Sequence, residues 1–237
     1  MNTIHFFGDS FTYGDGTRHT CMHNGEDWQM PNPNNNVFWT EYVCKQLDFH
    51  EKIHADRGMS NPEIIFQMLK VADHFEPGDI VIVGQSFPQR EPFFTRIPDI
   101  DRSLDWFATR IGSTQQPPPH ENHFSDQFKS DILPWHPSDL WVTTQSFIAN
   151  VKHAKHPYYK AWYDVQVKQL LLLFKKLGVD GLTWIVPDEA GNYENIRTAT
   201  NGLVDDAHWS WKGNLHFGRA MTKRVQRIIK LREKNGI

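Results

Sequence analysis

A serine near the start of the chain has the setting of a nucleophile. The run Thr3–Gly14 reads Thr-Ile-His-Phe-Phe-Gly-Asp-Ser-Phe-Thr-Tyr-Gly, and its apolar, aromatic first half predicts a buried strand. Gly8 ends this strand in a turn that presents Asp9 and Ser10 at the carboxyl end. Open α/β sheets carry out chemistry at that end, and a nucleophilic serine needs a sharp turn that lifts its Oγ clear of the sheet. A strand followed by an ordinary Asx turn would look the same, so the serine needs partners elsewhere in the chain.

A general base and a carboxylate occur together late in the chain. Residues 205–213 read Asp-Asp-Ala-His-Trp-Ser-Trp-Lys-Gly, just before a predicted final helix. A His and a carboxylate this close can share one loop, so that His208 points at a nucleophile while Asp205 accepts its other ring N–H. Asp206 is the competing acceptor. Such a pair also occurs in ordinary surface turns.

An alternation of strands and helices must position these residues. A continuous aliphatic run over 80–83 is typical of a strand covered on both faces. In chain order, we expect a helix over 37–47 capped by Asn36, a strand over 51–55, and a helix with Asn61 as its N-cap and Pro62 as its first residue. We then expect a strand over 80–83, a helix over 158–177 stopped by Gly178, a strand over 182–187 and a helix over 212–234. This order predicts a single α/β domain over 1–237, a three-layer α/β/α sandwich with a mostly parallel sheet.

A long segment at about 88–157 interrupts the alternation after the third strand. It is rich in Pro, His and aromatic residues. Because a structureless loop of this length is unusual in a compact domain, we expect short helices in it, for example over 103–110 and 138–151. Its position at the carboxyl edge of the sheet predicts a lid or a substrate wall.

Composition argues against several classes of partner. The net charge is −3, the pI is about 6.5, and no Lys/Arg run is present, so neither nucleic acid nor an anionic membrane is expected. No signal peptide or transmembrane stretch is visible, which predicts a cytoplasmic protein, and Cys21 and Cys44 are expected to be reduced thiols.

Cofactor and metal sites are not expected either. The pairs His120/His123 and His153/His156 have ligand-like spacing, but a zinc site needs three or four ligands and no further set is recognisable. The sequence also has no P-loop and no dinucleotide fingerprint.

Four features lie at the carboxyl ends of predicted strands, and together they resemble the SGNH hydrolases, also called the GDSL esterase family. Gly8–Gly14 is similar to the first block of that family, Arg57–Asn61 to the second and Asp205–His208 to the fifth, so that the resemblance spans essentially the whole chain.

The resemblance implies a flavodoxin-like fold and a role for each matching residue. Ser10 would be the nucleophile, and its backbone N–H one oxyanion donor, with the N–H of Gly58 as a second. His208 would be the general base and Asp205 would orient it, with Asp206 as the alternative. The family chemistry needs no cofactor.

The third block departs from the family. Where the family has Gly-x-Asn, with the Asn as third oxyanion donor, this chain has Gly84-Gln85-Ser86. Loss of one such donor typically lowers turnover by about 10²–10³-fold. Three alternatives follow: Ser86 replaces the Asn, Gln85 or another residue of the insertion does, or the site is weak.

Two further residues are candidates for substrate binding. Arg90 can bind a substrate carboxylate or phosphate, although a structural ion pair is the commoner role of such a residue. Asp9, beside the nucleophile, is the other candidate.

The combined prediction is a serine hydrolase that cleaves a small ester, either a carbohydrate O-acetyl group or a short acyl ester. The sugar substrate is suggested by aromatic residues that could stack on rings, namely Trp106, Trp135, Trp141 and Trp162. The alternatives are a non-catalytic binding or structural protein on the same fold and an acyl- or acetyltransferase with the same triad. The oligomeric state is left open.

Overall fold

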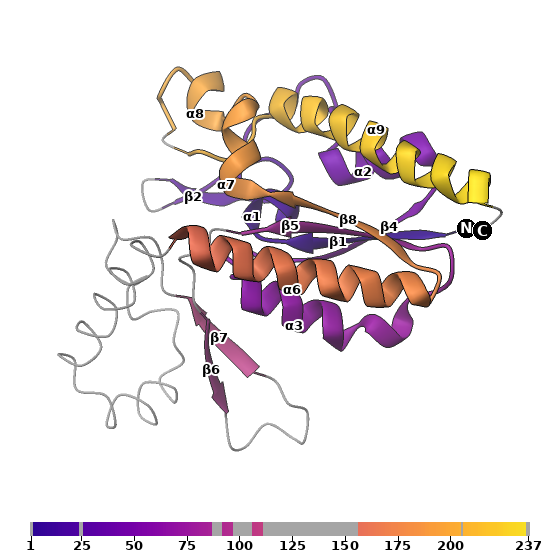
Figure 1. Ribbon diagram of the computed structural model, residues 1–237. Coiled ribbons are helices and arrows are strands. Elements are labelled where there is room, and N and C mark those ends of the chain that lie inside the picture. Colours follow the sequence, from indigo (N-terminus) through magenta and orange to yellow (C-terminus); the bar gives the residue numbers. More distant parts are fainter. Residues whose placement is uncertain are drawn as a thin grey trace.

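A parallel sheet of four strands lies at the centre of the protein (Figure 1). The computed structural model describes residues 2–23, 26–86, 92–96, 106–110, 156–204 and 206–235. The sheet has the spatial order β4-β1-β5-β8, formed by β1 (Thr3–Gly8), β4 (His50–Ala55), β5 (Ile80–Gln85) and β8 (Asp180–Ile185). Counted along the chain, this order is 2-1-3-4, the order of doubly wound flavodoxin-like sheets.

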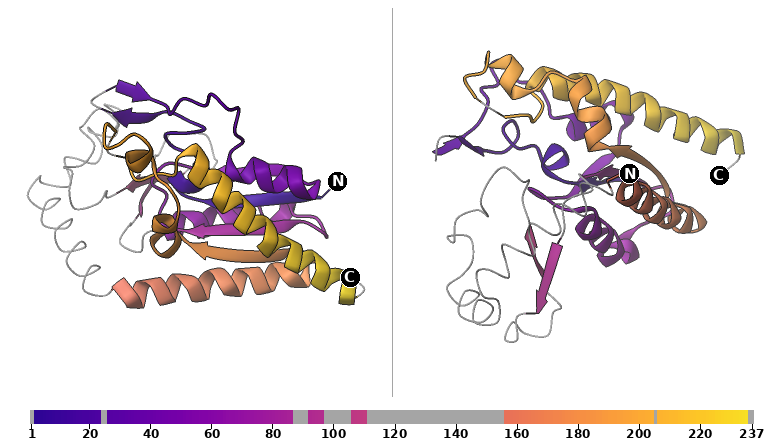
Figure 2. Two further views of the ribbon diagram at one scale, coloured as in Figure 1. Left: turned by 90° about the horizontal axis from the view of Figure 1, so that it is seen from above. Right: turned by 60° about the vertical axis from the view of Figure 1, so that its left-hand side comes forward.

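Helices cover both faces of this sheet, as the views in Figures 1 and 2 show. On one face lie α2 (Trp39–Leu47) and α9 (Trp211–Asn235), and on the other α3 (Asn61–Lys70) and α6 (His156–Lys176). Successive strand residues serve opposite faces, so Phe6 packs in the α2/α9 core and Phe7 in the α3/α6 core. The predicted three-layer α/β/α sandwich is therefore confirmed.

Shorter elements connect the layers. They are α1 (Ser10–Tyr13), β2 (Cys21–His23), β3 (Glu26–Trp28), η1 (Ala72–His74), β6 (Pro92–Arg96), β7 (Trp106–Arg110), α7 (Val186–Glu189), η4 (Ala190–Asn192) and α8 (Ile196–Ala199).

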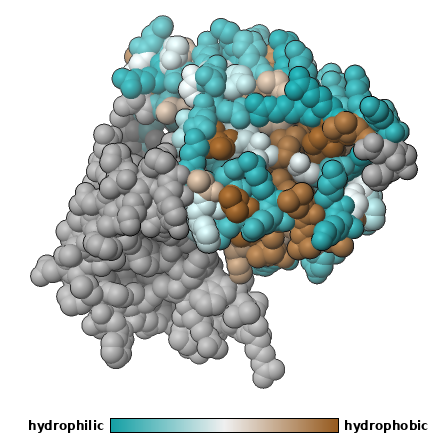
Figure 3. Space-filling model, viewed as in Figure 1, coloured by the Kyte–Doolittle hydropathy of each residue, from teal (hydrophilic) through white to brown (hydrophobic). Residues whose placement is uncertain are grey.

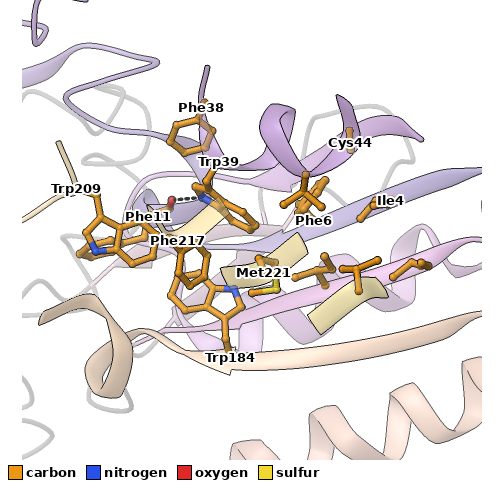
Figure 4. Close-up of a cluster of buried hydrophobic side chains, with 14 of the residues drawn as sticks. Ile4, Phe6, Phe11, Phe38, Trp39, Cys44, Trp184, Trp209, Phe217 and Met221 are labelled. Atoms are coloured by element: carbon orange, nitrogen blue, oxygen red, sulfur yellow. Dashed lines mark hydrogen bonds between the residues drawn. The ribbon is translucent and has the colours of Figure 1, made fainter. Parts of the chain in front are cut away.

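Aromatic side chains fill the core beneath α9 (Figure 4). The Trp184 ring stacks on Trp209, with centroids 5.5 Å apart, and Phe217 lies 4.4 Å from Trp209. Trp39 packs edge-on against Phe217, and its indole N–H donates to the carbonyl of Phe11 at 3.1 Å. This last bond ties α1, which begins at Ser10, directly to the core.

Two predicted helix starts differ from the observed ones. Helix α2 begins at Trp39, and its N-cap is Phe38, whose extended backbone ends the preceding loop. Helix α3 is capped by Ser60 rather than Asn61, because Ser60 and Glu63 form a reciprocal capping box. The Asn61 side chain is thereby free to bond elsewhere, and it does so at the candidate site.

The predicted helix over 103–110 is wrong for its described part. Residues 106–110 form β7, which pairs antiparallel with β6, so that Pro92 lies opposite Arg110 and Arg96 opposite Trp106. This pairing is long-range, and local periodicity does not report it. The expected helix over 138–151, and most of the expected lid, lie outside the described residues.

The other helix and strand predictions hold with small shifts at their ends. Gly178 ends α6, as predicted, with φ 81°, and the N–H groups of Gly178 and Val179 bond back to the carbonyls of Lys175 and Phe174. Strand β8 starts earlier than predicted and stops at Ile185, because the Pro that follows is part of α7.

Candidate active site

Ser10 stands in a tight turn between β1 and α1. Asp9 caps α1, and one of its carboxylate oxygens accepts the Phe11 N–H at 3.1 Å. A Cβ at Gly8 would lie 2.1 Å from the Thr12 hydroxyl oxygen, so the turn closes onto the strand only if this residue has no side chain. The sequence thus builds the turn that the opening motif predicts.

His208 joins Ser10 to a carboxylate. Its Nε2 lies 2.7 Å from Ser10 Oγ, and its Nδ1 lies 2.6 Å from Asp206 Oδ1. An ionised carboxylate only accepts hydrogen bonds, so Nδ1 carries the proton and donates to Asp206. The Nε2 lone pair then accepts from the Ser10 hydroxyl, which is the arrangement that a general base needs.

The carboxylate brought to His208 is Asp206, the alternative acceptor in the sequence. Its Oδ1 also accepts the backbone N–H of His208 at 2.7 Å, so that one oxygen holds both the ring and the main chain. Asp205 lies outside the described residues, and its predicted orienting role stays a prediction.

Backbone bonds and ring contacts hold this loop in place. The N–H groups of Ile196 and Arg197, in α8, donate to the carbonyls of His208 and Asp206 at 2.8 and 2.9 Å. The Phe11 ring lies 4.8 Å from the His208 ring, and Trp209 donates its indole N–H to the Ala190 carbonyl at 2.8 Å. The side chain of His208 is 23% exposed, so its imidazole can be reached from outside.

The charges around His208 favour its protonated form. Burial alone would lower the pKa of His208, but the hydrogen bond and charge of Asp206, together with the charges of Asp15 and Asp9, raise it overall. Burial raises the pKa of Asp206, but its hydrogen bonds with His208 outweigh this, so that its pKa is lowered overall. Asp206 is therefore ionised at neutral pH, and its negative charge favours the imidazolium form of His208.

The strand register places Gly58 beside the Ser10 turn. β1 and β4 are parallel, with Gly8 opposite Ala55, so the turn after β4 emerges next to the turn after β1. In this turn the Met59 N–H bonds to the Asp56 carbonyl at 3.4 Å, and Gly58 occupies the third position with φ 64°. That position of the turn favours glycine.

Ser86 flanks the Ser10 turn on its other side. β5 is also parallel to β1, with Phe7 opposite Val83. Asn61 holds the Ser86 backbone from both ends: its Oδ1 accepts the Ser86 N–H at 2.8 Å and its Nδ2 donates to the Ser86 carbonyl at 3.0 Å. The Ser86 hydroxyl donates to Asp9 Oδ2 at 2.8 Å.

Gln85 points away from this edge. Its amide nitrogen donates to Asp164 at 3.1 Å and to Thr183 at 2.9 Å, on the α6 side of the sheet. Of the two residues predicted as replacements for the third oxyanion donor, the structure thus brings Ser86 to the Ser10 turn and directs the Gln85 amide elsewhere. Which groups bind an oxyanion stays a prediction.

The two residues predicted to bind substrate have different outcomes. Asp9 is fully buried, and both of its carboxylate oxygens accept hydrogen bonds from the protein. These bonds make it a part of the turn, and its contact with a substrate stays a prediction. Arg90 lies outside the described residues.

Sequence reasoning missed two residue pairs that hold the site together. Asn61 with Ser86 is one, and Asp15 with Arg57 is the other, in which Arg57 Nε donates to Asp15 Oδ1 at 2.7 Å. Arg57 and Asn61 both belong to the motif around Gly58, but nothing in its spacing indicates the partners of their side chains.

One groove of the described surface lies beside α6, away from Ser10. It has a volume of about 490 Å³ and lies between α6, β8 and α9, where Figure 3 shows hydrophobic side chains. Its lining includes Leu171, Leu182 and Ile228 and none of the predicted site residues. The candidate site therefore rests on hydrogen-bond geometry and not on the size of a cavity.

Neither a metal-binding cluster nor a membrane-spanning helix is found in the described part of the chain. There, no group of three or more His, Cys, Asp or Glu side chains could hold a metal ion. In the same residues, no helix has the length and apolar character that crossing a membrane requires.

No protein-family model matches the sequence, and no curated protein matches it. Among solved structures, the chain is distantly similar to a carbohydrate esterase whose active site is described as having divergent catalytic and non-catalytic binding functions. The TM-score is 0.41 and the identity 13%, over 95% of this chain and 65% of that one. This chain thus spans about two-thirds of the length of the esterase.

Proposed function

We propose that the protein is a serine hydrolase that cleaves a small ester, with Ser10, His208 and Asp206 as its catalytic triad. The observation that carries this proposal is the unbroken chain of contacts from Ser10 Oγ to His208 Nε2 at 2.7 Å and from His208 Nδ1 to Asp206 Oδ1 at 2.6 Å. The resemblance of three motifs to those of the SGNH hydrolases supports it, because the matched residues Ser10 and His208 are in contact although 198 positions separate them.

The proposed reaction has two balanced halves. Ser10 Oγ attacks the ester carbonyl carbon while its proton passes to His208 Nε2, and the carbonyl oxygen becomes an oxyanion. The tetrahedral intermediate collapses, the alcohol leaves with the proton from His208, and an acyl ester remains on Ser10. Water then attacks this ester, with His208 again taking a proton and returning it to Ser10, and the acid is released.

The oxyanion would be bound by the N–H groups of Ser10 and Gly58, with the Ser86 hydroxyl as the third donor. Ser86 donates to Asp9 in this structure, so its hydroxyl hydrogen has to turn from Asp9 to the oxyanion during the reaction. A donor that must first leave a carboxylate stabilises the transition state less than a preorganised one. We therefore expect a turnover lower than that of a site with a third preorganised donor.

For the substrate we propose a small neutral ester, either a carbohydrate O-acetyl group or a short acyl ester. The aromatic residues behind the sugar alternative are only partly described. Trp162 in α6 is 50% exposed, Trp106 belongs to β7, and Trp135 and Trp141 lie outside the described residues. An exposed indole can stack on a sugar ring, which keeps the carbohydrate ester as the first substrate to test.

Hydrolysis of p-nitrophenyl acetate by the wild type and by Ser10→Ala tests the proposal. The variant removes a single hydroxyl group, so its melting temperature should stay within a few degrees of that of the wild type. We expect at least about a 10³-fold loss of kcat/KM, since the nucleophile is gone. Equal slow rates for both proteins would exclude the proposed reaction. Faster transfer of acetyl to an added sugar than to water would instead identify a transferase.

A further inference from the structure

Arg57 links the turn that carries Gly58 to the turn that carries Ser10. Its Nε donates to Asp15 Oδ1 at 2.7 Å, and its Nη2 donates to the carbonyl of Thr20. The guanidinium carbon also lies 5.8 Å from the centre of the Tyr13 ring. Arg57 thus contacts the segment after Ser10 at three points while standing next to Gly58 in the chain.

Asp15 is a suitable anchor because it is fixed to the nucleophile turn. Its backbone N–H bonds to the carbonyl of Ser10 at 3.2 Å, and its side chain is only 8% exposed. Burial raises the pKa of Asp15, and the charges of His208 and Arg57 counteract this. A buried carboxylate beside the triad is costly without a cation, and Arg57 supplies one.

The Gly58 turn needs such an anchor. Its closing hydrogen bond, from the Met59 N–H to the Asp56 carbonyl, is long at 3.4 Å. A turn with glycine at its third position can rotate the peptide that precedes this glycine, since no side chain opposes the change. Rotation of the peptide between Arg57 and Gly58 would change the direction in which the Gly58 N–H points.

We propose that Arg57, through its ion pair with Asp15 and its bond to the Thr20 carbonyl, is a positioning residue that keeps the Gly58 N–H directed at the oxyanion. This inference rests on the proposed hydrolase function and adds a specific role for a residue outside the triad. Arg57 acts through Gly58, so its loss should weaken transition-state binding and leave ground-state binding of the substrate nearly unchanged.

Arg18 provides a matched control. It forms a two-pronged ion pair with Glu51, at 2.9 and 3.1 Å, and its guanidinium carbon lies 5.8 Å from the centre of the Phe38 ring. Like Arg57, Arg18 therefore has a carboxylate partner and an aromatic ring beside its guanidinium group. Its ion pair, however, leads to β4 at the opposite end from the Gly58 turn.

The experiment compares Arg57→Ala, Arg57→Lys and Arg18→Ala in the hydrolysis of p-nitrophenyl acetate. For Arg57→Ala we expect kcat to fall about 10–100-fold with KM within about 2-fold, because a misdirected donor is missed only in the transition state. Arg57→Lys should recover part of this loss, since an ammonium can pair with Asp15 but does not reproduce the guanidinium fork toward the Thr20 carbonyl. Arg18→Ala should keep kcat within about 2-fold of the wild type.

A second measurement separates this inference from the proposed function. The rate of reaction with a fluorophosphonate is measured for the wild type, Ser10→Ala and the Arg57 variants. If the wild type and Ser10→Ala are both inert, both proposals fall. If the wild type is labelled at Ser10 and Arg57→Ala is labelled equally fast, only the role of Arg57 is overturned.

The kinetic pattern also decides against other roles of Arg57. A rise in KM at constant kcat would show that Arg57 binds substrate, and an equal loss in Arg18→Ala would show a general effect of losing an ion pair. Either result overturns the positioning role. Should Arg57→Ala fail to fold, Arg57→Lys carries the test, with an expected fall of kcat of about 3–10-fold at unchanged KM.

Discussion

At the scale of single residues, Asp206 is a carboxylate that contacts His208. Asp205 and Asp206 both stand close enough to His208 in the sequence to orient it, and spacing cannot choose between them. The choice depends on the local backbone, which lets Asp206 Oδ1 accept both the N–H and the Nδ1–H of His208. This double contact could not be predicted from the sequence, whereas the pairing of Ser10 with His208 could, because both residues belong to recognisable motifs.

Replacing the two carboxylates separately tests this assignment. Asp206→Asn should lower kcat/KM for p-nitrophenyl acetate by about 10²–10⁴-fold, because an amide no longer fixes the tautomer or stabilises the imidazolium. Asp205→Asn, the matched control, should stay within about 3-fold of the wild type. The reverse order of the two losses would show that Asp205 is the orienting residue.

The environment of His208 also sets a pH dependence. The imidazole must be neutral to accept the Ser10 proton, and the carboxylates of Asp206, Asp15 and Asp9 raise its pKa. Activity should therefore increase with pH through an apparent pKa above the ordinary histidine value of about 6.5. In Asp206→Asn, the apparent pKa of the residual activity should be lower than in the wild type, since the charge that most stabilises protonated His208 is gone. Profiles of kcat/KM from about pH 5 to 9 check both statements. An apparent pKa of the wild type below the ordinary histidine value would contradict them.

At the scale of elements, the end of β5 determines which of Gln85 and Ser86 lies beside the Ser10 turn. Successive strand residues point to opposite faces, so Gln85 and Ser86 cannot both face Ser10. The sequence left this choice open because it does not say which face carries the site. The bonds of Gln85 to Asp164 and Thr183 direct its amide to the α6 side of the sheet, and Ser86 is the residue of the two that contacts the Ser10 turn, through Asp9.

Alanine variants of the two residues provide the corresponding test. Ser86→Ala should lower kcat about 10-fold at nearly constant KM, because it removes a donor that acts in the transition state. Gln85→Ala removes hydrogen bonds to α6 and β8, so it should lower the melting temperature while kcat stays within about 2-fold. Unchanged turnover in Ser86→Ala would mean that the site works with two backbone donors.

A second feature of the sheet is a pair of stacked histidines on the α3/α6 face. His5 is buried, its Nε2 lies 3.2 Å from Asp79 Oδ2, and its Nδ1 lies 3.1 Å from His54 Nε2. Since Asp79 accepts from His5 Nε2–H, the His5 Nδ1 must accept from His54. Burial, with the charges of His5, Lys52 and His74, lowers the pKa of His54 to about 4.

This lowered pKa predicts a loss of stability in mild acid. Below about pH 6.5 an unfolded chain protonates this histidine, whereas the folded protein does so only near pH 4, so stability falls between these values as pH decreases. Discounted for partial exposure, the effect is about 2 kcal/mol. Urea unfolding of the wild type and His54→Asn at pH 5 and 7.5 measures it, together with the change that the substitution causes in the titration of its partner His5. An identical pH dependence in both proteins would contradict the prediction.

At the scale of the whole molecule, most of the fold could be predicted from the hydrophobic periodicity of the sequence and the order of its strands and helices. The parallel register brings the segments after β1, β4 and β5 to one edge of the sheet, and this is why residues as distant as Ser10, Gly58 and Ser86 become neighbours. Pairing between two short strands left no such signal, as the β6/β7 ribbon shows. Side-chain pairs across this edge, such as Arg57 with Asp15, could not be predicted from the sequence either. They form only because the strand register brings the turns after different strands together.

Covalent labelling shows whether Ser10 is an activated nucleophile, as the proposed function requires. The wild type, Ser10→Ala and His208→Ala are treated with a fluorophosphonate, and the modified peptide is mapped by mass spectrometry. We expect a single adduct on Ser10, none in Ser10→Ala, and labelling at least about 100-fold slower in His208→Ala, because the general base is gone. A wild type that remains unlabelled, or one that is labelled equally fast without His208, would contradict this expectation.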